Sequence, residues 1–210
     1  SARGTWGMPS PAFRSRCPAL PRCDRPGSSL RSGHSGSTSR LRSKWRAGKA
    51  SLDPANPAKF VVEDGTELVN AEGHSVDVCS EAKYGDAVIE VELMVPKGSN
   101  SGVYVHGEYE VQVLDSFGKA DDKMDMGDIG AIYGAAAPKV NASKAPGEWQ
   151  KFVINFRAPK FDADGKKTAN AVFVKVELNG KVLHENLEVK GPTPGGMTGK
   201  QLADKLLARK

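Results

Sequence analysis

Hydrophobic and polar positions alternate along most of the chain after residue 58, in short runs separated by Gly, Asp, Asn and Pro. This spacing is typical of antiparallel β-strands joined by turns. In residues 87–95 four apolar side chains share one face of a strand and two glutamates share the other: Ile89, Val91, Leu93 and Val95 against Glu90 and Glu92. The pattern predicts an all-β fold in which one face of each strand covers a common core.

Two later segments repeat the pattern and end in a tight turn. One face of residues 149–157 carries Phe152, Ile154 and Phe156, and one face of residues 171–178 carries Val172, Val174, Val176 and Leu178. Asn179-Gly180 then supplies the two residues with positive φ that a type I′ turn requires. The sequence therefore predicts a hairpin between residues 171–178 and 181–189.

The two ends of the chain lack this alternation. Residues 1–43 are rich in Arg, Ser, Gly and Pro, so they are predicted to form a disordered basic tail. Residues 198–210 carry Leu202 and Leu206 on one helical stripe and predict a short helix. The expected organisation is a tail at 1–43, an antiparallel β-sandwich at 44–196 and an atypical C-terminal tail at 197–210.

Charge is divided unevenly between these parts. The first 50 residues hold eleven Lys and Arg and one acid, Asp24, whereas residues 51–210 hold nineteen Lys and Arg and twenty-four Asp and Glu. The body is therefore acidic, although the whole chain has a net charge of +5. Because the positive charge lies in a tail without interleaved aromatics, we expect no nucleic-acid partner. An anionic polymer bound by the tail is the least favoured interpretation.

Other compositional signals are weak. No apolar run approaches the length of a membrane span, and the first 50 residues lack the apolar centre of a secretory signal. Cys17 and Cys23 lie in the tail and Cys79 is alone in the body, so neither a disulfide framework nor a zinc site is predicted. We expect no cofactor and no membrane span, and the pattern carries no signal for an oligomeric state.

Residues 96–115 carry the densest set of polar and aromatic side chains. They predict two strands joined near residue 107. In the second strand the period of 2 places Glu110 and Gln112 on one face, about 7 Å apart. In the first strand Asn100, Tyr104 and His106 share a face, so a hairpin in register would bring them beside this acid and amide.

Such a patch suits a sugar. Amides and carboxylates hydrogen-bond to vicinal hydroxyls, and an aromatic ring covers an apolar sugar face. The carboxylate and the imidazole also offer proton transfer. The same alternation is equally typical of a solvated strand face, and a histidine without a catalytic role is the simpler interpretation of His106 taken alone.

Four motifs occur in order along the body: Asn100-Ser-Gly-Val-Tyr104, Tyr109-Glu-Val-Gln-Val-Leu-Asp115, Gly130-Ala-Ile-Tyr-Gly134 and Pro146-Gly-Glu-Trp-Gln150. On these motifs residues 44–196 resemble the 3-keto-disaccharide hydrolase domain family. The resemblance implies a concanavalin-like jelly-roll β-sandwich whose concave sheet binds a sugar. It also implies a hydrolase that cleaves glycosides already oxidised to a ketone at sugar carbon 3.

The ketone makes the neighbouring C2 proton acidic, so that a base can remove it and the glycosidic bond can break by elimination before water adds. With this resemblance we expect Glu110 to be the acid/base group and His106 or Tyr104 to be a secondary proton or stacking partner. The implied substrate-binding residues are Asn100, Tyr104, Gln112 and Tyr133. The alternative function is a non-catalytic, lectin-like carbohydrate-binding module that uses the same patch.

Three expectations concern the regions around the motifs. Residues 121–128 form an acidic loop with Asp125 and Asp128, which either holds a structural cation or is simply solvated. Family members continue past Gly191-Pro-Thr193 with a final strand pair that residues 197–210 do not contain, which predicts an open sheet edge and reduced activity. By the resemblance alone, the expected location is periplasmic or extracellular.

Overall fold

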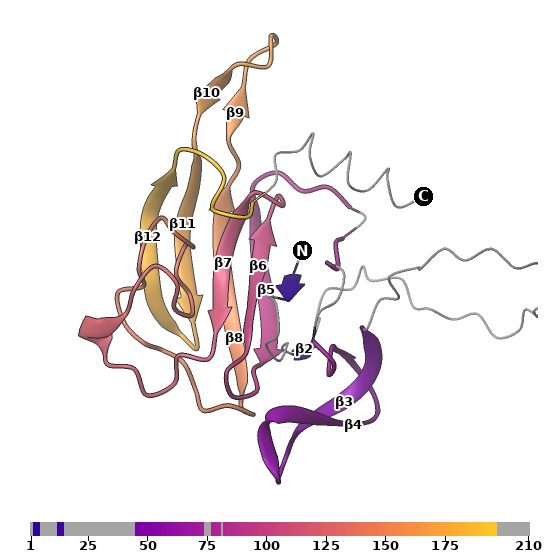
Figure 1. Ribbon diagram of the computed structural model, residues 1–210. Helices are drawn as coiled ribbons and strands as arrows, with labels where there is room; N and C mark the ends of the chain where they lie inside the picture. The colour runs from indigo at the N-terminus through magenta and orange to yellow at the C-terminus, as the bar shows by residue number, and fades with distance from the viewer. Residues whose placement is uncertain (1, 5–11, 15–44, 74–76, 81, 197–210) are drawn as a thin grey trace, which may run out of the picture.

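The computed structural model describes residues 2–4, 12–14, 45–73, 77–80 and 82–196. This part of the chain is an antiparallel β-sandwich in which a small sheet lies in front of a large one (Figure 1). Apart from one 3-10 turn, η1 (Asp121–Lys123), the described elements are strands. The predicted all-β fold is confirmed. Within the described ranges no helix is long and apolar enough to cross a membrane.

The large sheet has seven strands in the order β12-β11-β8-β5-β2-β4-β3, all paired antiparallel. Their bounds are β2 (Ala12–Arg14), β3 (Arg46–Asp53), β4 (Asn56–Val69), β5 (Ala87–Met94), β8 (Trp149–Arg157), β11 (Ala171–Leu178) and β12 (Lys181–Val189). A two-stranded arm of β9 (Lys160–Phe161) and β10 (Lys167–Ala169) projects beyond this sheet at the top of Figure 1.

The small sheet has the order β1-β6-β7, with β1 (Ala2–Gly4), β6 (Asn100–Val105) and β7 (Tyr109–Leu114). A tight turn joins β6 to β7. In it His106 and Gly107 have φ values of 56° and 72°, and the Glu108 N–H donates to the Val105 carbonyl at 3.1 Å. Two successive positive φ values are typical of a type I′ turn. Because Val105 pairs with Tyr109, three residues, 106–108, lie between the paired positions of this hairpin.

The core lies between the two sheets. Its buried side chains come from the inner faces of both layers: Val103, Val105, Tyr109, Val111 and Val113 from β6 and β7, and Leu93, Phe152, Ile154, Phe156, Phe173, Val176, Leu178 and Leu183 from the large sheet. Full burial of one such side chain contributes about 1.5–3 kcal/mol. Because strand side chains alternate, the residues between those of β6 and β7 point away from this core.

The predicted inner faces are correct for β5 and β8 but only half correct for β11. Phe173 and Val176 are fully buried, whereas Val172 and Val174 are not. The register of β11 against β8 shifts between Phe173 and Lys175, which marks a β-bulge. One extra residue in a strand reverses the faces on either side of it, so period 2 across residues 171–178 is wrong.

The Asn179-Gly180 hairpin turn is confirmed. The two residues have φ values of 52° and 80°, and Leu178 pairs with Lys181 across them. The Asn179 side chain also crosses to neighbouring elements, because its Oδ1 accepts from the Lys151 N–H at 3.0 Å and its Nδ2 donates to the Ala142 carbonyl at 2.8 Å.

Two pieces of the predicted disordered tail are strands. β1 pairs with β6, with Ala2 opposite Val103, and β2 fits between β4 and β5, with Ala12 opposite both Val69 and Met94. The prediction of disorder is therefore wrong for these pieces. A three-residue strand is too short to show alternation, yet its backbone groups satisfy those of the strands beside it. The remainder of residues 1–43 and the predicted helix at 198–210 lie outside the described residues.

Candidate active site

The candidate site is built on the outer face of the β6–β7 hairpin, where Tyr104 lies directly opposite Glu110. The Glu110 N–H and C=O both bond to groups beyond the far edge of β7, so this is a non-hydrogen-bonded pair, in which facing side chains come closest. The Tyr104 hydroxyl donates to Glu110 Oε2 at 2.5 Å. That length is at the short end of the range for a hydroxyl and an ionised carboxylate, about 2.5–2.7 Å.

Gly102 makes room for this carboxylate. A Cβ atom at residue 102 would overlap the Cγ, Cδ and Oε1 atoms of Glu110. The glycine is therefore required by the close approach of a side chain and not by a special backbone conformation. No role was predicted for Gly102, although a glycine inside a β-branched strand is a recognised signal of close approach.

Residues 130–133, which follow β7 after a loop, extend the small sheet beyond that strand. Its backbone forms three hydrogen bonds with that strand: Gly130 N–H to the Gln112 carbonyl at 2.8 Å, Gln112 N–H to the Ala131 carbonyl at 2.9 Å, and Tyr133 N–H to the Glu110 carbonyl at 3.1 Å. The motif Gly130-Ala-Ile-Tyr-Gly134 thus forms an added strand-like edge of the site.

This added edge places Tyr133 beside Glu110. Ile132 and Val111 face each other in an antiparallel bridge, and both are fully buried in the core. Because side chains alternate along each segment, Tyr133 lies on the outer face, opposite Glu110. Tyr104, Glu110 and Tyr133 therefore occupy facing positions in a row across three adjacent segments.

The amides occupy the next row of the same face. Gln112 lies between two small residues, opposite Gly102 on β6 and beside Ala131, and its Oε1 accepts from the Val113 N–H at 3.1 Å. Asn100 is half-buried on the same face of β6, opposite Leu114. The predicted register of the hairpin thus brings Tyr104 and Asn100 to the same face as Glu110 and Gln112. Tyr104, Glu110 and Gln112 are 7%, 6% and 3% exposed, so the patch is not a solvated strand face.

His106 does not join this row. Its ring packs edge-on against Phe156 of the core, with ring centroids 5.1 Å apart, and its Nε2 lies 3.3 Å from the Gly85 carbonyl. The predicted position beside Glu110 is therefore wrong. Residue 106 belongs to the turn and not to the strand, and its positive φ breaks the alternation that the prediction extended to it.

Thr193 fixes the start of β7, a role that the sequence analysis did not assign. The Thr193 Oγ1 accepts from the Glu110 N–H at 2.9 Å, and the Thr193 N–H donates to the Glu108 carbonyl at 3.0 Å. The residue is 4% exposed. A buried threonine 83 residues from its partner carries no local signal in a sequence.

His184 of β12 supports the added edge from the core side. Its Nε2 lies 2.9 Å from the Gly130 carbonyl, and the residue is 5% exposed. Burial lowers the pKa of His184, more than the hydrogen bond to Gly130 raises it. The ring is therefore neutral at pH 7, with the proton on Nε2, where it can be donated to the carbonyl.

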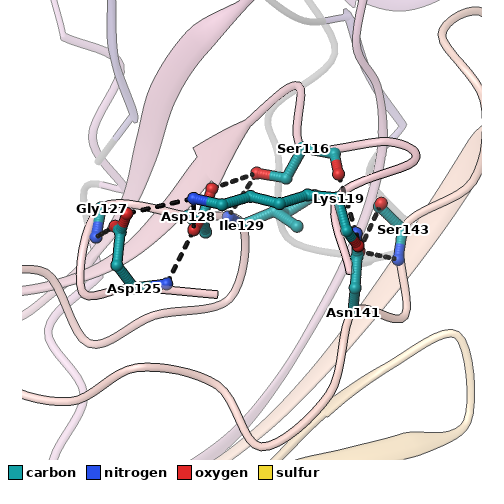
Figure 2. A network of polar contacts seen from close by, with 8 residues as sticks. All are labelled: Ser116, Lys119, Asp125, Gly127, Asp128, Ile129, Asn141 and Ser143. Carbon is teal, nitrogen blue, oxygen red and sulfur yellow. Dashed lines mark hydrogen bonds and ion pairs between the residues drawn. The ribbon is translucent and has the colours of Figure 1, made fainter. Parts of the chain in front are cut away.

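Two aspartates of the acidic loop share one lysine, Lys119, which precedes the loop. The Lys119 Nζ lies 3.0 Å from Asp125 and 2.5 Å from Asp128 (Figure 2). The ammonium thus bridges the two carboxylates. Nowhere in the described ranges do three His, Cys, Asp or Glu side chains gather in a way that could hold a metal ion.

Two surface hollows lie on the outer face of the large sheet, away from this site. One, of about 430 Å³, is lined by Lys151, Val153 and Glu177 among others, and the second, of about 400 Å³, is lined by Asn155, Arg157 and Val174 among others. These side chains lie on the face opposite the core residues of β8 and β11, and Val174 lies at the β11 bulge. Neither hollow is lined by a carboxylate next to a tyrosine. The candidate site is therefore recognised by its chemistry and not by the depth of a pocket.

The fold and this face together define a β-sandwich domain that gathers an acid, amides and phenols on one sheet, a set of groups suited to sugars. Residues 34–205 match the family model of the 3-keto-α-glucoside-1,2-lyase-like domain, and the chain belongs to this family. The resemblance inferred from the motifs is confirmed, and the match extends beyond the predicted limits of 44 and 196 at both ends. The chain is therefore a carbohydrate-related domain.

Among solved structures, the chain is similar to a "putative glycosyl hydrolase" from Parabacteroides distasonis ATCC 8503. The two chains are 32% identical, with a TM-score of 0.47 over 54% of this chain and 50% of that chain. The similarity thus spans half the length of that protein. The comparison with curated proteins found no match.

Proposed function

We propose that the chain cleaves the glycosidic bond of 3-keto-glycosides by elimination followed by hydration, with Glu110 as the base. The family is described as a 3-keto-α-glucoside-1,2-lyase-like domain, and a ketone at C3 makes the C2 proton acidic. The base removes that proton, the bond from C1 to the aglycone oxygen breaks, and this oxygen takes up a proton as it leaves. A double bond between C1 and C2 remains, and water adds across it to give the 3-keto-sugar.

The observation that carries the proposal is the Tyr104–Glu110 pair. The phenol donates to one carboxylate oxygen at 2.5 Å, which holds the carboxylate on the outer face of the hairpin. The other oxygen, Oε1, lies against Gly102, where a Cβ atom would overlap it. Asn100, Gln112 and Tyr133 share this face, and we assign them to the sugar hydroxyls and the apolar sugar face. We assign no step to His106, because its ring packs against the core.

Turnover of a 3-keto aryl glucoside tests the proposal. The chain releases the aglycone, and Glu110→Gln, which keeps the size of the side chain but cannot take up the proton, slows release by about 10²–10⁴-fold. The matched control is Glu90→Gln, which removes a carboxylate from the outer face of the large sheet, where it pairs with Lys151 at 2.7 Å. The control retains the parent rate. Equal rates for the parent and Glu110→Gln would contradict the assignment.

The rival function is carbohydrate binding without catalysis. It is favoured by the burial of the patch and by the internal hydrogen bonds of Glu110 and Gln112, since a binding site needs only satisfied polar groups. A titration of the same keto-glucoside, followed by calorimetry, separates the two functions. Binding without release of the aglycone would establish the rival and overturn the enzyme.

A further inference from the structure

A network of hydrogen bonds outside the sugar-facing row holds the loop that precedes the 130–133 segment (Figure 2). At its centre is Asp128, whose two carboxylate oxygens accept three hydrogen bonds. The Ser116 hydroxyl donates to Oδ1 at 3.0 Å, and the Lys119 ammonium and the Asp125 N–H donate to Oδ2 at 2.5 Å and 2.8 Å. The Ser116 hydroxyl also contacts the backbone of the residue after Asp128, because its Oγ accepts from the Ile129 N–H at 3.1 Å.

The network is tied down at its far end by Asn141. Its Nδ2 donates to the Ser116 carbonyl at 2.7 Å and to the Lys119 carbonyl at 2.8 Å, and its Oδ1 accepts from Ser143. Ser116 and Lys119 therefore cannot shift along the loop without losing these contacts. The lysine that meets Asp128 is held in position by its backbone as well as by its ammonium.

Asp128 and Asp125 share one lysine but differ in burial. The Asp128 side chain is 4% exposed and that of Asp125 is 68% exposed. The hydrogen bond to Asp128, followed by that to Asp125, raises the pKa of Lys119. A buried carboxylate with three donors is costly to break, because each donor loses its acceptor away from water, whereas an exposed pair contributes little. The contact between Lys119 and Asp128 is therefore the one that stabilises the loop.

What the network holds is the outer edge of the candidate site. Residue 128 lies two positions before Gly130, where the hydrogen bonds between residues 130–133 and β7 begin. Within the same turn the Ala131 N–H donates to the Asp128 carbonyl at 3.0 Å. A shift of this turn by one residue would move Tyr133 to the core face and Ile132 to the outer face, since side chains alternate.

We propose that Asp128 is a positioning residue of the site: through Ser116 and Lys119 it sets the register of residues 130–133 on β7, and so holds Tyr133 opposite Glu110. The proposal rests on the proposed function only for its effect on turnover. The effect on register is a property of the fold and is measured separately.

The test is backbone hydrogen exchange in Asp128→Asn, with Asp125→Asn as the matched control on the same lysine. The amides that report are those of Gly130, Gln112 and Tyr133, which donate across the edge. In Asp128→Asn their protection falls at least about tenfold, while amides of the β11–β12 hairpin keep theirs. Asp125→Asn retains parent protection at all of them. Ser116→Ala, which removes the link to Ile129, gives the same local loss if Asp128→Asn does not fold.

The kinetic readout is kcat and KM for the 3-keto aryl glucoside. Asp128→Asn lowers kcat/KM and Asp125→Asn does not. Parent protection at the three reporting amides in Asp128→Asn and Ser116→Ala, or an equal loss in Asp125→Asn, would overturn the proposal. If the parent chain releases no aglycone while Asp128→Asn loses protection at the edge, the proposed reaction fails and the positioning role stands.

Discussion

At the scale of single residues, the candidate site depends on two neighbours of Glu110, Tyr104 and Gly102. A phenol donates to one oxygen of the carboxylate and the absence of a side chain at residue 102 accommodates the other. Period 2 along two strands was enough to predict that Tyr104 and Glu110 share a face. It could not predict that Gly102 is needed, because the overlap depends on a side-chain rotamer of the facing strand. It misplaced His106, because the alternation ends where the turn begins.

Gly102→Ala tests the role of the missing side chain. The added Cβ overlaps the Glu110 carboxylate, so the carboxylate must leave its place under Tyr104, at a cost of about 1–3 kcal/mol in the free energy of unfolding. We expect the rate of aglycone release to fall with Glu110 still present. The control is Gly85→Ala, where a Cβ meets nothing within 4 Å. Urea denaturation and turnover assays measure both effects, and unchanged turnover in Gly102→Ala would contradict this account.

At the scale of elements, turns were predictable and bulges were not. Asn179-Gly180 specifies a type I′ turn through its own backbone preferences, and the structure has that turn. The bulge of β11 near Val174 has no such local signature, because it depends on how β11 aligns with β8. The outer edge formed by residues 130–133 was missed for the same reason. Its strand-like pairing arises from contacts with β7 and not from an alternating run of its own.

Two substitutions at residue 179 separate the turn from its side-chain contacts. Asn179→Gly keeps the positive φ but loses the hydrogen bonds to Lys151 and Ala142, which costs about 1 kcal/mol in the free energy of unfolding. Asn179→Ala loses the same bonds and also strains the left-handed backbone, which costs about 2 kcal/mol. Urea denaturation gives both values. If the alanine variant proves no less stable than the glycine variant, the turn does not limit stability.

At the scale of the whole molecule, alternation along the chain predicted a sandwich with one core but not what surrounds the site. Thr193 contacts Glu110 across 83 residues, and His184 contacts Gly130 across 54. Contacts between residues so far apart in the sequence depend on how the two sheets pack, and a local pattern of hydrophobic and polar residues does not predict them. The same holds for β1 and β2, which are strands because the sheets beside them offer backbone partners.

The buried His184 makes stability depend on pH. Burial lowers the pKa of His184 in the folded protein below the ordinary value of 6.5. Between this lowered pKa and pH 6.5, the unfolded chain therefore binds a proton at His184 that the folded chain does not. The contribution of the neutral His184 ring to the free energy of unfolding is complete above about pH 6.5 and falls as the pH drops below this value. Urea denaturation near pH 7.5 and near pH 5.5 measures the loss. His184→Gln can still donate to Gly130 and has a smaller pH dependence; an unchanged dependence would contradict the assignment.

The most direct test of the central claim is cleavage of a 3-keto aryl glucoside in D₂O, with the hydrogen at C2 of the released 3-keto-sugar followed by NMR. Elimination and hydration predict deuterium at C2 as the aglycone is released, at a rate above the exchange of the same sugar incubated with Glu110→Gln. Release of the aglycone with the original proton still at C2 would show that the bond is broken by direct displacement and would contradict the role of Glu110 as the base that removes it.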